Sequence, residues 1–444
     1  MKKNIKKSMK KTVKNSVQKK AKVSRFPIIK LPIPELLLPA GDPEKLRYAI
    51  EYGADAVYMG LPMFGMRSRK NDFDKKTFLA EIKKVRELNK KATKTGGRQV
   101  KVYITVNIFP RNNKIDAFKK YMEFLRDEVK PDALIIADPG VIEIAKEFYP
   151  EAVLHLSVQA NTLNYKSVEF WKKQGIVRVI LPRELMLEEI AEIHKRVPDI
   201  ELEAFVHGAI CMAYSGRCLL SAYMTGRDAN QGICAHSCRW KYKMYLEEEE
   251  RPGEFMPIEE HDEGTYIMNS RDNCAIEYLR ELWDAGITSF KIEGRNKTVY
   301  YLAVVAKAYR QAIDDMVAGR KFDKELLVEL NKVSNRGYIP GFLKGFPGKD
   351  NVKFDKNSSE SAFKFLGIVR EVDGDLYRVE ARNRFEVGDE VEVITPSENQ
   401  FVKIKEILNL KKEPVEAAHG GDKDVWVKLG KGIEVGALLR MKNF

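Results

Sequence analysis

The sequence predicts an α/β protein whose main domain is a (β/α)8, or TIM-like, barrel. Between Glu35 and Gly319, eight short apolar stretches typical of strands alternate with eight amphipathic stretches typical of helices. The turn after the first strand, Pro39-Ala-Gly-Asp-Pro43, lacks the G-x-G-x-x-G pattern of a dinucleotide-binding doubly wound sheet. The repeated strand–helix unit therefore favours the closed barrel over the doubly wound sheet.

The expected strands are short and mostly apolar, and their ranges are Glu35–Pro39, Ala54–Gly60, Lys101–Asn107, Ala133–Asp138, Val153–Ser157, Val177–Leu181, Glu201–His207 and Ile287–Glu293. The expected helices carry one apolar face, and their ranges are Pro43–Tyr52, Lys75–Lys90, Ile115–Val129, Val141–Phe148, Tyr165–Lys173, Glu184–Lys195, Cys274–Ala285 and Thr298–Gly319. Because active sites of such barrels lie where the strands end, we looked there for polar side chains. These ends carry Asn107, Asp138, Gln159, Asn161, Arg183, His207 and Arg295. Each one singly is also explained as a cap or turn residue, as in the helix start Asp138-Pro-Gly.

All five cysteines lie within about one seventh of the chain, at Cys211, Cys218, Cys234, Cys238 and Cys274. Thiolates are soft ligands, and four of them together suit an iron–sulfur cluster or zinc. Their intervals of six, fifteen, three and thirty-five residues match neither the ferredoxin patterns nor a paired C-x2-C zinc ribbon. The spacing therefore leaves iron and zinc both open. The competing interpretation is that they are small buried residues.

The cysteines belong to an insertion, residues 209–273, that leaves the end of the seventh strand. We therefore expect the cysteines and the polar strand ends to meet. Within the insertion, Lys241–Glu250 and Phe255–Met268 predict a hairpin around the turn Arg251-Pro-Gly-Glu254. Its acidic tip is typical of a solvated face, and cation binding by its carboxylates is only weakly indicated.

Charge is distributed unevenly along the chain. The net charge is +13, and no acidic residue precedes Glu35, whereas that tail holds eleven lysines and Arg25. Without these twelve cations, 65 basic residues face 64 acidic ones. Residues 1–34 are therefore predicted to form a disordered basic arm. Attraction to nucleic-acid phosphates and a merely solubilising extension explain it equally well, and an amphipathic targeting helix is a third alternative.

The rest of the chain divides into three parts. The barrel domain is expected over 35–336, and the Gly- and Pro-rich stretch 337–361 predicts a linker. Residues 362–444 alternate short strands with turns such as Val387-Gly-Asp389, which predicts a small β-barrel. Such modules contact RNA or partner proteins, or serve the fold alone.

Composition excludes several classes of protein. The content of 44% hydrophobic and 32% charged residues is that of an ordinary soluble globular protein. The apolar runs are too short for a membrane span, and the basic start lacks the apolar core of a secretory signal. An odd number of cysteines without an export signal indicates the reducing cytosol, so we expect a cytoplasmic protein.

Several motifs resemble the signature of peptidase family U32, the collagenase-like peptidases. The two most specific are Glu203-x-Phe205-x-His207-Gly208-Ala-x-Cys211 and Tyr-Ser-Gly-Arg217-Cys218-x-Leu-Ser221. Further matches are Glu35-Leu-Leu-x-Pro-Ala-Gly41, Gly53-Ala-Asp-Ala-Val-Tyr58 and Lys291-Ile-Glu-Gly-Arg295. Four other features resemble the tRNA-hydroxylating branch of the family. They are Arg67-Ser-Arg69-Lys-Asn71, Arg227-Asp-x-Asn-Gln-Gly232, Cys238-Arg-Trp240 and the hairpin up to Tyr266-Ile-Met-Asn-Ser270. The resemblance runs from about Glu35 to the C-terminus, and Asn273 departs from the apolar residue expected before Cys274.

The resemblance implies an enzyme that hydroxylates the wobble uridine of tRNA at C5, giving 5-hydroxyuridine. It further implies a 4Fe-4S cluster and prephenate, rather than oxygen, as the source of the hydroxyl group. By position, Cys211, Cys218, Cys234 and Cys274 match the cluster ligands of the family, with Cys238 as the alternative ligand.

Substrate-binding and catalytic residues follow from the same resemblance. Arginine pairs with carboxylates, so the dicarboxylate prephenate would contact guanidinium groups. The candidates for this are Arg67, Arg69, Arg217, Arg239 and Arg295, although a structural ion pair explains any one of them. An extruded uridine needs a ring to stack on and groups that bind its edge. The candidates for that are Gln159, Asn161, Tyr214 and Trp240, and Asn71 and Asn107 are further substrate-binding candidates. Catalytic roles are expected for His207, Arg217, Arg295 and Glu203.

Two other functions compete with this one. A peptidase would fit the family name, but the chain has neither H-E-x-x-H nor G-x-S-x-G. A Cys211–His207 dyad can be drawn, yet crowding with other thiols favours a metal site. The third interpretation is a cluster-bearing scaffold that works with a paralogous partner subunit.

Overall fold

The computed structural model describes residues 31–65, 73–211, 213, 218–240, 245–247, 250, 252–253, 256–257, 270–345, 361–421 and 424–443. The predictions for the basic arm up to residue 30 lie outside the described residues. So do five of the predicted site residues, namely Arg67, Arg69, Asn71, Tyr214 and Arg217.

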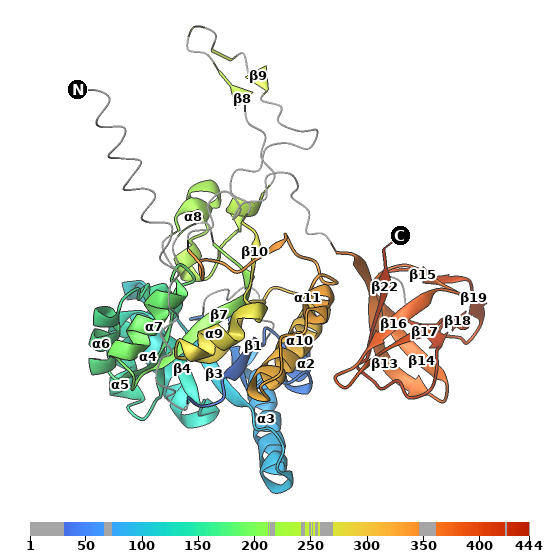
Figure 1. Ribbon diagram of the computed structural model, residues 1–444, viewed down its shortest axis with the longest axis horizontal. Helices are drawn as coiled ribbons and strands as arrows, with labels where there is room; N and C mark the ends of the chain where they lie inside the picture. Colours follow the sequence, from blue (N-terminus) through green and yellow to red (C-terminus); the bar gives the residue numbers. More distant parts are fainter. Residues whose placement is uncertain are drawn as a thin grey trace, which may run out of the picture. The chain divides into compact units, whose positions relative to one another are not determined.

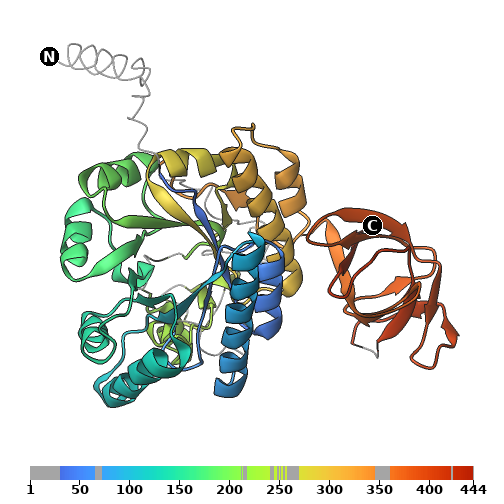
Figure 2. The same cartoon turned by 90° about the horizontal axis from the view of Figure 1, so that it is seen from below.

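The main domain is the closed barrel that the sequence predicts. Its parallel strands are β1 (Glu35–Pro39), β2 (Ala56–Met59), β3 (Lys101–Val106), β4 (Ala133–Ile136), β5 (Leu154–Leu156), β6 (Ile176–Ile180), β7 (Glu201–Ala209) and β11 (Ile287–Ile292). From β1 to β7, each strand pairs with the next strand along the chain. The last strand, β11, pairs with both β7 and β1, which closes the barrel. Figure 2 shows the strands enclosed by a layer of helices.

The enclosing helices are α2 (Pro43–Glu51), α3 (Lys75–Thr95), α4 (Ile115–Phe124), α5 (Pro139–Phe148), α6 (Tyr165–Lys173), α7 (Leu187–Arg196), α9 (Leu279–Asp284), α10 (Val299–Val317) and α11 (Glu325–Leu330). Several begin at a side chain that accepts a backbone N–H of the first turn. Asp42 accepts from Lys45, Asp74 from Thr77 and Asp138 from Val141. Asp138 is therefore a helix cap at the end of β4.

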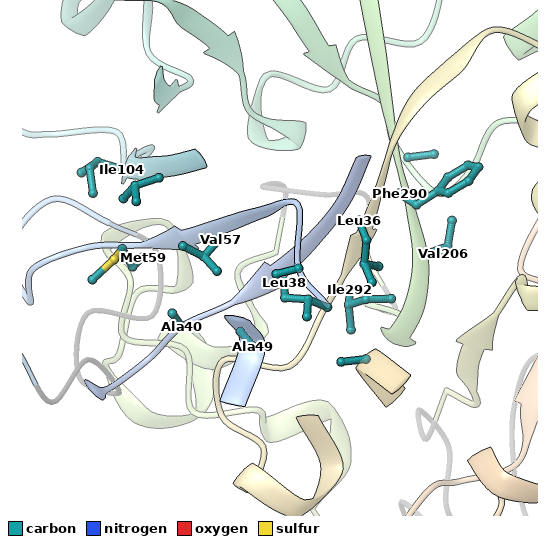
Figure 3. Packing of buried hydrophobic residues seen from close by; sticks show 14 of the residues in the cluster. Leu36, Leu38, Ala40, Ala49, Val57, Met59, Ile104, Val206, Phe290 and Ile292 are labelled. Carbon is teal, nitrogen blue, oxygen red and sulfur yellow. The ribbon is translucent and has the colours of Figure 1, made fainter. Parts of the chain in front are cut away.

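The core follows from the alternation of side chains along each strand. Leu36, Leu38, Val57 and Ile292 point outward from the barrel and pack under the helices, where Ala49 of α2 meets them (Figure 3). The residues between them point into the barrel. There Leu37, Tyr58, Tyr103, Ile135 and Ile180 form a second, inner cluster. The mouth of the barrel is thus built on a filled interior.

The chain between β7 and β11 departs from the prediction of a helix over Cys274–Ala285. Asp272–Cys274 form a short strand, β10, antiparallel to the end of β7, and a 3-10 turn (Ile276–Tyr278) precedes α9. The Asn273 amide donates to the Phe205 carbonyl at 2.9 Å, which fixes this pairing. Tertiary pairing overrides the local helical pattern here. Tyr338–Ile339, at the start of the expected linker, form β12 and pair with β10.

The C-terminal part is an antiparallel β-sheet domain, as the sequence predicts. Its strands are β13 (Phe363–Asp373), β14 (Leu376–Ala381), β16 (Glu390–Ile394), β17 (Asn399–Lys403), β18 (Glu406–Leu408), β19 (Pro414–Val415), β21 (Val425–Lys428) and β22 (Leu438–Lys442), with β15 (Phe385–Glu386) paired to β20 (Ala417–Ala418). The sheet has its own apolar core around Val379, Val393 and Leu439. Its Arg440 is wholly buried and donates to Glu392 and to Glu329 of α11.

The insertion contains helix α8 (Leu220–Thr225), the 3-10 turns Ala229–Gln231 and Ser237–Arg239, and the paired strands β8 (Tyr245–Leu246) and β9 (Met256–Pro257). In Figure 1, α8 lies beyond the end of β7. The paired strands agree with the expected hairpin, and the rest of that hairpin lies outside the described residues. Within the part of the chain that the structure describes, no helix has the length and apolar character needed to cross a membrane.

Candidate functional site at the barrel mouth

The barrel interior is crossed by a buried chain of ion pairs. Glu35 accepts from Arg178 at 2.7 Å, and Arg178 also contacts Glu203 at 3.2 Å. Glu203 accepts in turn from the Lys291 ammonium at 2.8 Å. Burial raises the pKa of Glu35, but Arg178 outweighs that effect, so the pKa lies below its ordinary value.

Glu203 has no exposed surface and is held by two cations. Its contacts are those of a buried structural ion pair, and they do not support the catalytic role predicted for it. Its position in the middle of β7 explains the mismatch, because a barrel interior is filled by side chains and substrate binds beyond the strand ends.

Toward the mouth, cations alternate with aromatic rings. The Lys291 ammonium lies 4.6 Å from the centre of the Tyr58 ring and 5.3 Å from that of Phe205. The Arg183 guanidinium carbon lies 3.6 Å from the centre of the same Phe205 ring. Arg295, almost fully buried, donates to Thr105 at 3.3 Å. This mouth layer (Tyr58, Arg183, Phe205, Lys291 and Arg295) offers positive charge and flat rings to an anionic or aromatic ligand.

Amide side chains continue the mouth beyond β3 and β5. Asn107 donates to Ser157 at 2.9 Å, so the two strand ends are tied together. In the described part of the chain, the side-chain oxygens of Gln159 and Asn161 are buried and have no hydrogen-bond partner. Such acceptors are costly unless something satisfies them. They are therefore suited to bind N–H groups of a ligand, as predicted for a base edge.

His207 ends β7 in an aromatic cage. Its ring centre lies 5.9, 5.3 and 5.2 Å from those of Tyr301, Tyr309 and Tyr338. Burial lowers the pKa of His207 to about 3, so the imidazole is neutral. Nδ1 lies 3.3 Å from the Tyr309 hydroxyl, whereas no partner is described for Nε2. A neutral imidazole held in this way can donate or accept a hydrogen bond, but it offers no positive charge to a substrate.

Four of the five cysteines gather in the insertion. Burial raises the pKa of the Cys238 thiol, the neighbouring Arg239 lowers it, and the thiols of Cys211, Cys234 and Cys218 raise it further. Each of these three thiols therefore lies close enough to Cys238 to act on it electrostatically. Cys211 is exposed, whereas Cys218, Cys234 and Cys238 are half-buried.

Cys274 lies in β10, opposite His207 of β7 and beside the aromatic cage. Its thiol is 3.8 Å from the Tyr309 hydroxyl, and burial raises its pKa to about 11. The groups that act on the Cys238 thiol thus include the other three thiols of the insertion, whereas those that act on Cys274 are Ile276, Tyr309 and Glu277. The resemblance to the family pointed to Cys274.

The four cysteine thiols of the insertion are chemically suited to bind a soft metal centre. Four thiols from one insertion are the donor set that iron–sulfur clusters use. Among the described residues, no three His, Cys, Asp or Glu side chains already stand in the geometry of metal ligands.

The insertion is fastened to the mouth through its Gln231. This side chain donates to the Phe109 carbonyl at 2.6 Å and accepts from Lys114 at 3.1 Å. Both partners follow β3, so the cysteine-bearing segment lies over the same end of the barrel as the polar strand ends, as expected. Trp240, after the last 3-10 turn, is 43% exposed, and Arg239 is half-buried.

Sequence reasoning assigned no site role to two cations of the mouth, Arg183 and Lys291, although Arg183 stood among the expected strand ends. Lys291 alternates with Phe290 and Ile292 inside an apolar strand, and that inward position was the available signal. Arg183 stands three residues after β6 ends at Ile180, which is the strand-end position expected for it.

Comparison with known proteins places this arrangement among related chains. The family model "Peptidase family U32" matches residues 41–353, and "Peptidase family U32 C-terminal domain" matches 361–440. The tRNA hydroxylation protein P of Escherichia coli is 41% identical over 93% of this chain and 97% of its own. An uncharacterized protease of Methanocaldococcus jannaschii is 34% identical over 90% of this chain and 96% of its own.

A third relative, the 23S rRNA 5-hydroxycytidine C2501 synthase of Escherichia coli, is 34% identical over 64% of this chain and 40% of its own. The family models cover both the barrel with its insertion and the C-terminal domain. The chain belongs to peptidase family U32.

Proposed function

We propose that this chain is an RNA-hydroxylating enzyme whose substrate is tRNA. One observation carries the proposal, namely the 41% identity to a tRNA hydroxylation protein over nearly the whole of both chains. The similarity to an rRNA 5-hydroxycytidine synthase supports the reaction class, because that relative also hydroxylates a pyrimidine in RNA.

At finer detail, we propose hydroxylation of the wobble uridine at C5 with prephenate as the co-substrate. The mouth layer supports an anionic co-substrate, because the guanidinium groups of Arg183 and Arg295 lie over the Phe205 and Tyr58 rings there. A guanidinium fork matches a carboxylate in two hydrogen bonds, so the two arginines would grip and orient a dicarboxylate. Gln159 and Asn161 would then bind the edge of the uracil ring through their unpartnered oxygens.

We also propose a 4Fe-4S cluster held by Cys211, Cys218 and Cys234, with either Cys238 or Cys274 as the fourth ligand. Proximity supports Cys238, and the family resemblance supports Cys274. When bound, such a cluster supplies one-electron transfer or activation of a substrate oxygen. The protein contributes the anchored insertion, which would hold the cluster over the mouth.

Cysteine variants test this proposal. Wild type, Cys211→Ala, Cys238→Ala and Cys274→Ala are purified without oxygen and analysed for iron and sulfide, and each is tested for tRNA hydroxylation in cells. We expect about four irons per wild-type chain, and loss of both iron and hydroxylation in Cys211→Ala. Of the other two variants, the one that retains iron does not supply the fourth ligand. A Cys211→Ala protein that holds no iron but still hydroxylates tRNA would contradict the role of the cluster.

A peptidase remains the second candidate, because one relative is named as a protease. Cys211 is exposed, as a nucleophile must be, but His207 is enclosed by tyrosines rather than aimed at it. Cleavage of denatured collagen or casein by the purified wild-type protein, abolished in Cys211→Ala, would favour this function over RNA hydroxylation.

A further inference from the structure

The insertion presents an unusually exposed apolar and aromatic surface. Tyr223 is 87% exposed, Leu219 73%, Trp240 43% and Met224 41%. These four residues are called the α8 face below. Leu219 and Tyr223 are one helical turn apart, since the Tyr223 N–H donates to the Leu219 carbonyl at 2.9 Å. Large side chains gathered in this way on a protein surface mark an interaction site.

The exposed side chains stand on a well-anchored helix. On the opposite side of α8, Ser221 is buried, and its hydroxyl donates to the Arg227 carbonyl at 2.7 Å. The same hydroxyl accepts from the Ala235 N–H at 2.8 Å, beside Cys234. Thus α8 is held against the cysteine-bearing loop by its inner side, and its outer side is left to solvent. The exposure of Tyr223 is a property of a fixed helix face.

The segment that carries the α8 face has an excess of basic residues, which suits a polyanionic partner. Residues 209–240 contain three arginines and a single acidic residue, Asp228. The Asp228 carboxylate lies 3.9 Å from the guanidinium of the exposed Arg111. Arg111 belongs to the segment after β3, three residues before Lys114. Exposed aromatic side chains beside cations bind single-stranded nucleic acid, with phosphates on the cations and bases on the rings. Arg111, whose side chain is 76% exposed, is a cation that the structure places at this segment.

We propose that the α8 face is a stacking platform for unpaired bases of the RNA substrate, with Tyr223 as its principal ring. This inference rests on the proposed function and names the surface by which that substrate is held. Because Gln231 fastens the same segment to the Phe109 carbonyl, a base stacked on Tyr223 lies at the rim of the barrel mouth. The neighbouring nucleotides are then directed toward the cysteines and the mouth layer.

Binding of an unmodified tRNA transcript to the full-length protein tests the platform. We compare wild type, Tyr223→Ala, Tyr223→Phe and a control, Phe170→Ala, by fluorescence anisotropy at fixed salt. Phe170 is a similarly exposed ring, at 54%, but it lies on α6 of the barrel wall. We expect Tyr223→Ala to raise Kd about tenfold, because one base–ring stack is lost. Tyr223→Phe, which keeps the ring, and Phe170→Ala should stay within about twofold of wild type.

The outcomes separate this inference from the proposed function. Equal tRNA affinity of wild type and Tyr223→Ala would overturn the platform, while tRNA hydroxylation by wild type would still stand. A change in self-association of Tyr223→Ala, measured by sedimentation with tRNA affinity unchanged, would assign the face to a protein contact and also overturn it. A wild-type protein that neither binds nor hydroxylates tRNA would refute the proposed function itself.

Discussion

At the scale of single residues, the barrel interior is governed by charges that water barely reaches. Glu35, Arg178, Glu203 and Lys291 are each at most 8% exposed, and every one of them contacts an opposite charge. A buried ion left without its partner is far more costly than an exposed one. The network is therefore tightly coupled, and its members respond unequally to mutation.

Lys291→Met should destabilise the protein by about 3–5 kcal/mol, because it removes one of the two cations that neutralise Glu203. Urea unfolding measures the loss. The matched control is Lys101→Met, which removes a largely exposed cation 3.4 Å from Glu35 and should cost less than about 1 kcal/mol. Equal losses in the two variants would show that burial does not decide the strength of these pairs.

His155 should make stability depend on pH. Burial, followed by the charges of Arg178, Lys291 and Lys101, lowers its pKa well below the ordinary 6.5. Below pH 6.5, His155 binds a proton in the unfolded chain, whereas in the folded chain it stays neutral. Stability is therefore fully present above pH 6.5 and falls at lower pH, by up to about 1.4 kcal/mol per pH unit from this residue.

His155→Gln removes this contribution. We expect the free energy of unfolding of the variant, measured in urea, to change less between about pH 7.5 and 5.5 than that of wild type. The difference between the two proteins isolates His155 from the other histidines. Identical pH dependence of the two proteins would mean that His155 is not held neutral by its surroundings.

At the scale of elements, the strand ends depend on close approaches that only particular residues allow. Gly208 in β7 has φ +103°, and a Cβ there would lie 2.5 Å from the Glu293 carbonyl oxygen. Gly208→Ala should therefore force β7 and β11 apart next to His207, at a cost of about 1–3 kcal/mol.

Gly175→Ala is the control for that substitution. Gly175 also has a positive φ, +83°, but a Cβ there meets nothing within 4 Å. The extra loss of Gly208→Ala over Gly175→Ala, measured by thermal unfolding, reports the steric contact alone. If the two variants lose the same stability, backbone conformation and not the approach of β11 explains the glycine.

The positions of most strands could be predicted from the sequence. Each of the eight barrel strands was placed to within about two residues of its observed limits, because apolar periodicity is set locally. The helix expected over Cys274–Ala285 was partly wrong, since Asp272–Cys274 pair with β7. Its apolar pattern is compatible with either structure, and only a partner strand distant in the chain decides. Tyr338 joined the sheet for the same reason.

The candidate site was harder to predict than the fold. The polar strand ends followed from topology, but the contact of Arg183 with Phe205 depends on side-chain packing across strands. The cysteine grouping depends on how the insertion folds back through Ser221 and Gln231. Sequence intervals carry no information on such folding, so Cys238 and Cys274 could not be ranked from spacing.

At the scale of the whole molecule, three parts converge on one end of the barrel. The mouth layer supplies cations, the insertion supplies thiols, and the α8 face supplies exposed rings. The C-terminal domain is joined to the barrel domain by the buried Arg440 and by the Tyr48 hydroxyl, which donates to the Gly436 carbonyl at 2.7 Å. This arrangement suits a large polyanionic substrate that carries a small reactive target.

The central claim is that this chain adds a hydroxyl group to tRNA. The most direct measurement expresses it in a bacterial host deleted for its own tRNA hydroxylation protein, then analyses nucleosides from separated tRNA and rRNA by mass spectrometry. We predict a uridine derivative heavier by one oxygen atom in the tRNA fraction, absent from cells with the empty vector. A folded, expressed protein that yields no hydroxylated nucleoside in tRNA, or yields one only in rRNA, would contradict the account.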